Sequence, residues 1–188
     1  MATRVFLDAC VLYPPLVRRL LVDAAGAGLF LPLWSARVLE EWRLAVARKE
    51  GLEAEAAVEA ARATMALAHP RAECPPAPGV EAALFLPDPA DAHVLAAAAG
   101  GGAEVLLTFN LRDFPRRTLA AHGIEARHPD SFLWELASHA PEAVEAAIAA
   151  ALPGEDAAGR RRALKRARLP RLGKALEARA LGPGRPAL

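Results

Sequence analysis

The sequence contains little cysteine, few aromatic residues and no long apolar run. Two of its 188 residues are cysteine, Cys10 and Cys74, which excludes a disulfide framework or a cysteine-rich zinc cluster and favours a reducing compartment. Aromatic residues make up 5% of the chain. Because alanine is abundant, we expect the helices to pack closely through small side chains.

Targeting and membrane-spanning segments are also missing from the pattern. The alanine tract at 96–99 is too short and too weakly apolar to span a bilayer. Asp8 interrupts the first apolar residues too early for a signal peptide. With 54% hydrophobic and 24% charged residues, the composition is that of a globular protein. We expect it to be cytoplasmic, without membrane association.

Charge is unevenly distributed along the chain. The formal net charge is +1, but residues 155–188 carry ten Lys and Arg against three acidic residues, while residues 1–154 carry thirteen against nineteen. An acidic body with a basic tail can mark a protein that binds a polyanion or an acidic protein. A solvated helical face is the alternative interpretation of the tail.

Short apolar segments alternate with helical patterns in the first part of the chain. Strands are expected at 4–7, 104–107 and 124–126, and 29–31 is a further short apolar run. The expected helices lie between Pro14 and Gly26, at 36–48, from Gly51 to about 67, at 88–99 and at 129–137, with a proline-rich loop at 70–79. This alternation predicts an α/β fold, a three-layer α/β/α domain with a mostly parallel central sheet.

The pattern becomes purely helical beyond Pro141, with helices expected near 142–151, 156–168 and 171–180. We therefore divide the chain into a domain of residues 1–138 and a basic helical extension of residues 139–188. Basic residues crowd one stretch of the extension: Arg160, Arg161, Arg162, Lys165, Arg166 and Arg168. Like charges at helical spacing destabilise an isolated helix, so leucines such as Leu164 and Leu172 must dock it. We expect a small helical subdomain that presents its arginines outward.

Acidic and polar residues stand where two of the expected strands end. Asp8 follows the strand at 4–7, and Thr108, Asn110 and Asp113 follow the strand at 104–107. Ligands of parallel α/β sheets bind outside the carboxyl ends of the strands, so we expect these side chains to converge on one site. Capping of a turn or helix is the alternative role for Asp8. It is less favoured, because a charge directly after buried apolar residues is costly without a partner.

Helical periodicity separates the members of two further acidic pairs. Asp91 shares a face with apolar residues of its helix and therefore points inward, whereas Asp88 precedes Pro89 and is placed to cap the helix. In the helix at 36–48, Glu41 flanks the apolar arc and Glu40 projects from the opposite face. Asp91 and Glu41 are thus the candidate functional acids, and an inward carboxylate needs a cation.

The candidate acids suit a hard divalent cation, Mg²⁺ or Mn²⁺, which prefers carboxylate oxygens. The five histidines are scattered along the chain, and none forms a zinc-ligand spacing. A nucleophilic role for Cys10 is disfavoured, because cysteine is commonly a small buried residue and no paired histidine is evident.

Four segments, taken in order, resemble the PIN-domain ribonucleases, especially toxins of the VapC type. They are 5–12 (VFLDACVL), 38–42 (VLEEW), 88–95 (DPADAHVL) and 106–114 (LLTFNLRDF), and the resemblance covers about residues 4–135. One segment alone is a weak signal, and four in the family's order are a fairly specific one. The domain of residues 1–138 is therefore expected to be a PIN-like nuclease domain.

The resemblance implies a metal-dependent endoribonuclease that is the toxin of a toxin–antitoxin pair, with Mg²⁺ or Mn²⁺ as cofactor. The family's catalytic and metal-binding acids fall on Asp8, Glu41, Asp91 and Asp113. Thr108 and Asn110 match the polar position that helps hold the site or the scissile phosphate. The implied hydrolysis of RNA leaves a 5′-phosphate and a 3′-hydroxyl. The expected partners are RNA, a cognate antitoxin protein and, in a homodimer, a second copy of the chain.

Some residues lie outside the family pattern. Cys10 stands where many relatives have asparagine, which alters the hydrogen bonds that orient Asp8. The helical extension is longer than a minimal PIN domain needs. Arg112, with Arg116 and Arg117, lies near the acids in sequence, where it can contact the RNA backbone or remain an ordinary surface arginine.

Three rival interpretations can be weighed against the same residues. A haloacid-type phosphatase needs a second aspartate where this chain has Cys10. A response-regulator receiver needs an adjacent acidic pair near the N-terminus and a late lysine after a strand. The lysines of this chain are Lys49, Lys165 and Lys174, and none of them follows an expected strand. A PIN-like module that only binds RNA or protein remains the alternative, and the presence of all four acids counts against it.

Overall fold

The computed structural model of the protein describes residues 2–180, which pack as two compact units. The first unit, called here the sheet unit, contains residues 2–13 and 30–128. The second, called the helical unit, contains residues 14–29 and 129–180. These compact units do not test the predicted division of the chain into functional domains after residue 138, and that division stays a prediction. None of the helices in residues 2–180 is long and apolar enough to cross a bilayer.

The sheet unit is built on five parallel strands in the order β3-β2-β1-β4-β5. The strands are β1 (Arg4–Leu7), β2 (Leu31–Ser35), β3 (Glu73–Cys74), β4 (Val105–Leu107) and β5 (Glu125–Arg127). In the central strands, Phe6, Leu7, Leu106 and Leu107 are fully buried. Strands covered on both faces consist of continuous apolar residues, which explains why β1 and β4 were visible in the sequence.

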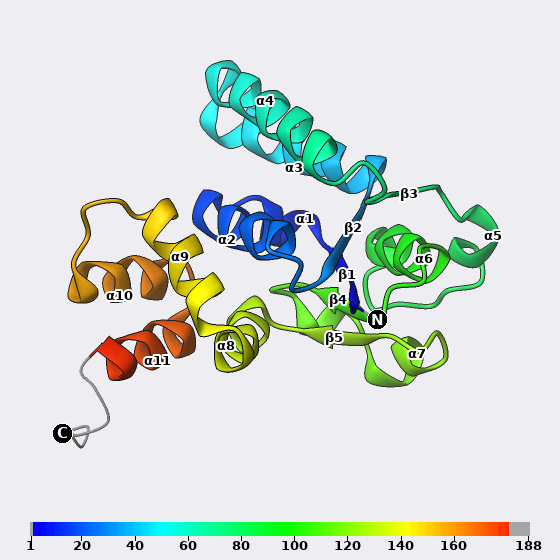
Figure 1. Cartoon of the computed structure of the whole chain (residues 1–188). Coiled ribbons are helices and arrows are strands. Elements are labelled where there is room, and N and C mark those ends of the chain that lie inside the picture. Colours follow the sequence, from blue (N-terminus) through cyan, green and yellow to red (C-terminus); the bar gives the residue numbers. More distant parts are fainter. Residues whose placement is uncertain (1, 181–188) are drawn as a thin grey trace. The chain divides into compact units, whose positions relative to one another are not determined.

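Helices lie on both faces of this sheet (Figure 1). They are α1 (Ala9–Leu12), α3 (Ala36–Glu50), α4 (Leu52–Ala68), α5 (Pro78–Glu81), α6 (Ala92–Gly100) and α7 (Arg116–Ala120), with single 3₁₀ turns η1 (Pro89–Asp91) and η2 (Leu111–Asp113). The chain moves from β1 outward to β2 and β3, and then returns to add β4 and β5 on the other side. Because such crossovers are right-handed, the helices after the return cover the opposite face. The predicted three-layer α/β/α fold is confirmed.

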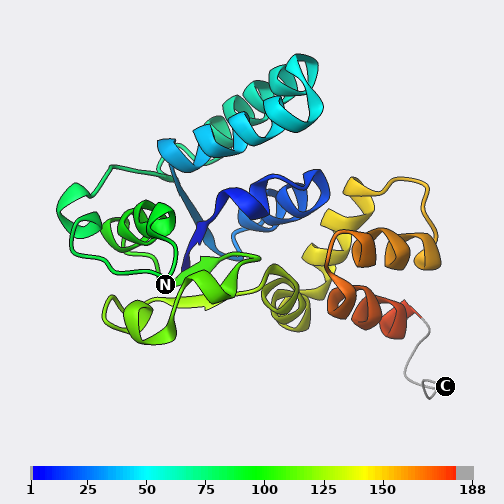
Figure 2. The same cartoon turned by 180° about the vertical axis from the view of Figure 1, so that it is seen from behind.

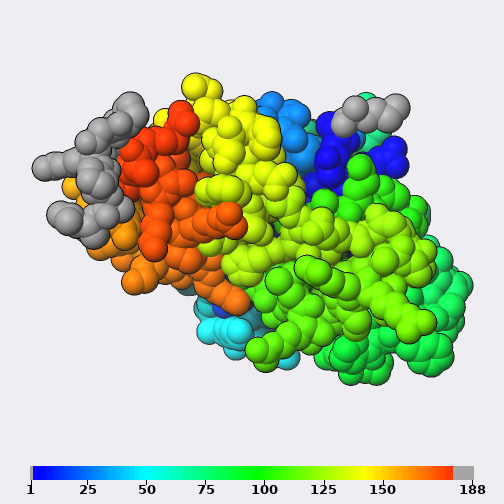
Figure 3. All heavy atoms as spheres, turned by 90° about the horizontal axis from the view of Figure 1, so that it is seen from below, coloured from blue at the N-terminus to red at the C-terminus, as the bar shows by residue number. Residues whose placement is uncertain are grey.

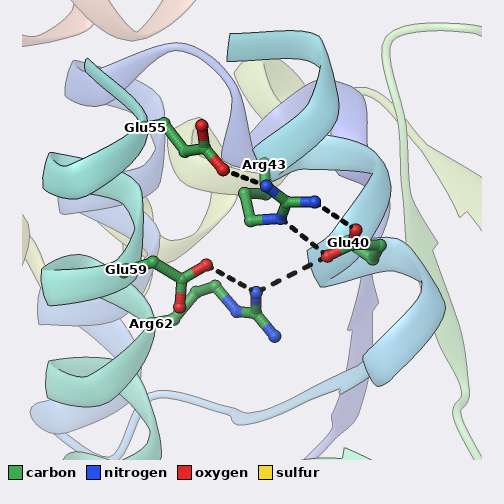
Figure 4. Close-up of polar contacts among 5 residues, drawn as sticks. All are labelled: Glu40, Arg43, Glu55, Glu59 and Arg62. Carbon is green, nitrogen blue, oxygen red and sulfur yellow. Dashed lines mark hydrogen bonds and ion pairs between the residues drawn. The ribbon is translucent and has the colours of Figure 1, made fainter. Parts of the chain in front are cut away.

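The first long helix of the sheet unit, α3, pairs side by side with α4 (Figure 2). Arg43 of α3 forms ion pairs with Glu40 and with Glu55 of α4, and Arg62 pairs with Glu59 at 2.9 Å (Figure 4). The Arg43 guanidinium lowers the pKa of Glu40 from its ordinary value. Glu40 therefore belongs to the α3–α4 contact, which agrees with its separation from the candidate site.

The helical unit contains α2 (Pro15–Gly26), α8 (Pro129–His139), α9 (Pro141–Ala151), α10 (Ala157–Arg166) and α11 (Pro170–Ala180). Asp130 of α8 accepts the backbone N–H groups of Arg171 and Leu172, at 3.0 and 2.9 Å, where α11 begins. Leu164 and Leu172 are fully buried, and α11 packs against α8 (Figure 3, red-orange against yellow-green). Packing thus orders the basic stretch, as expected from its charge.

Two expected elements differ from the structure. The second strand occupies 31–35 rather than the apolar run at 29–31, and the expected loop at 70–79 contains β3 and the start of α5. The backbone N–H of Trp34 donates to Ala72 at 2.9 Å, so β3 forms by pairing with the edge of β2. A strand of two residues has no periodicity that a sequence could show.

Candidate active site

The direction in which strands are added reverses between β1 and β4. From β1 the chain adds β2 and β3 on one side, whereas β4 and β5 lie on the other side. In open α/β sheets, ligands bind beyond the carboxyl ends of the strands at such a reversal. Asp8 directly follows β1 and Thr108 directly follows β4, so both residues stand at this point of the sheet.

Asp8 is held by its side chain and does not cap a helix. It is 8% exposed, and its Oδ2 accepts hydrogen bonds from Thr108 Oγ1 at 2.7 Å and from Cys10 Sγ at 3.0 Å. Asp8 precedes α1, but its side chain makes no capping hydrogen bond there. Asp88, in contrast, accepts the backbone N–H of Ala90 at 2.9 Å and caps η1 as predicted. The capping alternative for Asp8 is therefore not realised.

Cys10 is a hydrogen-bonding partner of Asp8 rather than a nucleophile. Its Sγ also accepts the backbone N–H of Phe109 at 3.2 Å. Burial, followed by the charge of Asp8, raises the pKa of the Cys10 thiol to about 12. Since the thiolate is the reactive form of cysteine, this residue stays a neutral donor near neutral pH. The hydrogen bond from Cys10 thus helps to orient Asp8.

Asp91 and Asp113 lie within electrostatic reach of Asp8. Burial first, and then the charges of Asp8, Asp113 and Asp88, raise the pKa of Asp91 to about 6, while His93 opposes the shift. Asp91 ends η1 and Asp113 ends η2, so both come from short turns near the sheet edge. Three of the four predicted acids therefore share one negatively charged neighbourhood, and a bound cation would relieve their repulsion.

Glu41 faces a different partner, the buried His93 of α6. Its Oε1 lies 2.7 Å from His93 Nε2 and 3.6 Å from Arg37 Nε. His93 is 5% exposed and follows Asp91 by two residues. The side chains of Glu41 and Glu40 are 40% and 45% exposed, so burial hardly separates them. The contact with His93 does, because it connects Glu41 to the segment that carries Asp91.

The polar residues predicted to bind substrate occupy two environments. Thr108 is fully buried, and its Oγ1 both donates to Asp8 and accepts the backbone N–H of Asn110 at 2.9 Å. Thr108 thus fixes Asp8 from β4. Asn110 and Arg112 are exposed on the segment that follows β4. Their contact with substrate stays a prediction.

The acidic residues fit a hard divalent cation by their chemistry. Carboxylate oxygens suit Mg²⁺ and Mn²⁺. Burial, and after it the neighbouring negative charges, raise the pKa of Asp91, and a bound cation would offset both effects. Within residues 2–180, no three His, Cys, Asp or Glu side chains stand close enough together to enclose a metal ion.

The role of His93 was not predicted from the sequence. The absence of a zinc-ligand spacing among the histidines excludes a zinc site of that pattern, but it does not test whether a histidine forms a hydrogen bond in the core. A signal was nevertheless present, because His93 lies in the buried run 92–98 of α6, whose other residues are apolar. A polar ring in such a run needs a hydrogen-bonding partner, and Glu41 supplies it from α3.

Comparison with known proteins identifies one matching family and one partial relative. A family model described as a PIN domain matches residues 3–112, which include Asp8, Glu41 and Asp91 and end one residue before Asp113. Over 58 residues the chain is 47% identical to "Putative ribonuclease VapC50" of Mycobacterium tuberculosis. This stretch covers 31% of the chain and 34% of that protein, so the match spans about a third of the relative. No solved structure matches the chain significantly. The family model covers more than half of the sequence, and the chain belongs to the PIN-domain family.

Proposed function

We propose that the chain is a metal-dependent endoribonuclease that hydrolyses RNA phosphodiester bonds at the carboxyl edge of its sheet. The observation that carries the proposal is Asp8 at the β1–β4 reversal, held by Thr108 and Cys10. Asp91 and Asp113 lie within range of its charge. Crowded carboxylates at this position of an α/β sheet form a site for a divalent cation and a phosphate ligand.

The proposed roles follow from these contacts. Asp8, Asp91 and Asp113, together with Glu41, would hold Mg²⁺ or Mn²⁺. The cation, when bound, supplies activation of a water and neutralisation of charge on the leaving oxygen. Thr108 and Cys10 keep Asp8 oriented, and His93 keeps Glu41 oriented. Asn110 and Arg112 are exposed and would contact the phosphate backbone.

We further propose that this nuclease is the toxin of a toxin–antitoxin pair and acts in the cytoplasm. Its partners would be an RNA substrate, a cognate antitoxin protein and a second copy of the chain. Support comes from the likeness to VapC-type proteins and from the partial identity with a protein named as a ribonuclease. The two cysteines are free thiols, as is usual in a reducing compartment.

A PIN-like module that binds RNA or protein without cutting it is the second candidate. It is favoured by one observation: within residues 2–180 no three potential ligands are grouped tightly enough to enclose a metal ion. A weakened metal site would leave the charged edge able to bind and unable to cleave.

Cleavage of a mixed RNA pool decides between the two candidates. The wild-type chain is incubated with the pool in the presence of Mg²⁺, of Mn²⁺ or of a chelator, and the ends of the fragments are analysed. The nuclease predicts fragments with 5′-phosphate and 3′-hydroxyl ends in either metal, and none in the chelator. RNA binding without cleavage in both metals would favour the non-catalytic module.

A further inference from the structure

A pocket at the amino ends of the strands has no role in the scheme above. It is a cavity of about 580 Å³, which is within the size range of small-ligand sites. Arg4 at the start of β1, the start of β2, the end of α4 and the turn from α4 to β3 line it. The pocket therefore lies in the sheet unit, at the end of the sheet opposite to the candidate active site.

This pocket is separate from the candidate metal-binding acids. Arg4 is the first residue of β1, and Asp8 directly follows the last residue of the same strand. Because a strand rises about 3.3 Å per residue, these two positions lie about 13 Å apart along the strand. None of the four predicted acids lines the cavity. A ligand in the pocket would therefore leave the acidic edge unoccupied.

The pocket contains two arginines and no acidic side chain. Arg4 and Arg71 line it, and neither guanidinium forms an ion pair or a hydrogen bond with another residue in the range 2–180. Glu104 accepts the backbone N–H of Arg4 at 3.1 Å, but it does not pair with the side chain. A cleft lined by charges of one sign concentrates ions of the opposite sign. The pocket therefore favours an anionic ligand.

One of the two guanidinium groups lies against a glycine turn beside the cavity. A Cβ atom added to Gly102 would stand 2.8 Å from Arg4 Nη1, so only a residue without a side chain leaves room for the guanidinium there. Gly102 has a φ of +66°, a conformation that also favours glycine. Its neighbour Gly101 lines the pocket. A charged group that is placed before binding loses less conformational freedom when the ligand binds.

The remaining wall of the pocket is apolar and contains rings. Leu31, Pro32 and Pro70 line it, and the prolines fix the local backbone because their φ angles are locked. His69 also lines the pocket, and its ring packs edge-on against Trp34 with 6.2 Å between the ring centres. Leu31 is 49% exposed, so a ligand that covers it would remove apolar surface from water. Such a wall suits the face of a flat ring.

We propose that this pocket binds a nucleoside 5′-phosphate, with the phosphate on Arg4 and Arg71 and the base against the apolar wall. A phosphate monoester carries a charge of about −1.5 to −2 at pH 7, which matches two guanidinium groups better than the single charge of a carboxylate does. The forked guanidinium also fits phosphate with two parallel hydrogen bonds. A free nucleotide and the 5′-phosphorylated end of an RNA share this chemistry. The proposal goes beyond the proposed function, since it needs neither the acids nor a metal ion.

Titration of the full, metal-free chain with AMP in a phosphate-free buffer tests the proposal. The signals are the NMR resonances of the methyl groups of Leu31, Leu33, Ala68 and Ala72, which line the pocket. We expect AMP to shift them, and we expect adenosine and inorganic phosphate each to bind at least about tenfold more weakly, because each lacks one half of the ligand. Absence of shifts with AMP overturns the proposal, and so does binding of adenosine or of inorganic phosphate as tight as that of AMP.

Two pairs of variants keep this test specific. Arg71 is exposed, and Arg71→Gln should weaken AMP binding by about tenfold or more, because a hydrogen bond to a charged group is lost. Arg48→Gln, the same change on the exposed surface of α3, should leave AMP binding unchanged. Ala68→Phe at the end of α4 should fill the pocket and abolish the shifts, whereas Ala57→Phe on the exposed surface of the same helix should not. If Ala68→Phe does not fold, Arg71→Gln decides, and wild-type affinity of that variant contradicts the proposal.

A short RNA distinguishes the two sources of the ligand. The probe is an adenylate tetranucleotide with a 5′-phosphate, added with a chelator so that it stays intact. Tighter binding of this RNA than of AMP, with shifts of the same methyl groups, identifies the 5′ end of an RNA as the ligand, whereas tighter binding of AMP identifies a free nucleotide. Both results support the pocket. A tetranucleotide with a 5′-hydroxyl that shifts the same signals with equal affinity would contradict the role of the two arginines.

Discussion

The two units of the chain carry opposite charges under different constraints. In the sheet unit, Asp8 is nearly buried and held by two hydrogen bonds. In the helical unit, Arg162, Lys165 and Arg166 of α10 are exposed. A buried charge needs defined partners, whereas an exposed one is satisfied by water. The function proposed for the acidic edge (Asp8, Asp91 and Asp113) therefore rests on geometry, whereas a function for the basic helix α10 would rest on its charge alone.

The largest expected effect concerns the packing beneath the acidic edge. Leu106 of β4 is fully buried, so Leu106→Ala should lower the free energy of unfolding by about 2–5 kcal/mol. The measurement is urea denaturation followed by circular dichroism. Leu44→Ala is the control, because Leu44 is 46% exposed and should change stability by less than about 0.5 kcal/mol. Equal effects of the two substitutions would contradict the described core.

In the helical unit, one acidic side chain holds the start of α11. Asp130 accepts two backbone N–H groups where α11 begins. Asp130→Ala leaves these donors without that partner and should cost about 1–3 kcal/mol. Hydrogen exchange of the α11 amides measures the loss, and Asp156→Ala, which removes a cap of α10, shows whether it is local. Unchanged exchange in α11 would mean that Asp130 does not hold this helix.

The raised pKa of Asp91 at the acidic edge should make the stability of the folded chain depend on pH. The pKa of Asp91 is about 6 in the folded chain, against an ordinary value of 3.8. Between these values the folded chain binds a proton that the unfolded chain releases, so stability falls as pH rises through this window. Metal-free protein should thus melt at a higher temperature near pH 5 than near pH 7, by a margin that Asp91→Asn reduces. If the melting temperatures of wild type and Asp91→Asn depend on pH in the same way, Asp91 does not belong to the charged neighbourhood.

The smallest expected effect tests whether the basic helix touches RNA. Arg162 and Arg166 are exposed on α10, and each phosphate contact on single-stranded RNA adds about 0.7 to the slope of log affinity against log salt. Arg162→Gln with Arg166→Gln should weaken binding and reduce that slope by up to about 1.4. Arg48→Gln with Lys49→Gln is the control in α3. An unchanged slope would make an acidic protein partner, or solvent, the better account of the tail.

Elements with a continuous local pattern could be predicted from the sequence, whereas elements that form through contacts between distant segments could not. β1 and β4 each contain three consecutive buried apolar residues, and the helices beyond Pro141 show regular periodicity, so both were expected. β3 consists of two residues that pair with β2, and no local pattern indicates such a strand. The short helix α7 (Arg116–Ala120) was not expected, because five residues are too few to display a helical period.

The candidate site was predictable to the extent that its residues follow local rules. The end of an apolar strand indicated Asp8, and the Asp-Pro step separated the capping Asp88 from Asp91. The contact of Glu41 with His93 joins α3 to α6, and only the fold brings these helices together. For the same reason, the hydrogen bonds from Cys10 and Thr108 to Asp8 could not be predicted from the sequence, and only the structure shows them.

The most direct test of the account is the RNA cleavage rate of Asp8→Asn compared with Asp88→Asn. Both substitutions remove one negative charge and keep the shape of the side chain, and asparagine still serves as a helix cap at position 88. We predict that Asp8→Asn lowers the Mg²⁺-dependent rate by more than about a hundredfold, beyond the loss typical of outer-shell partners, with an unchanged melting temperature. Asp88→Asn should retain the wild-type rate within about threefold. Full activity of folded Asp8→Asn would contradict the assignment of this edge as the active site.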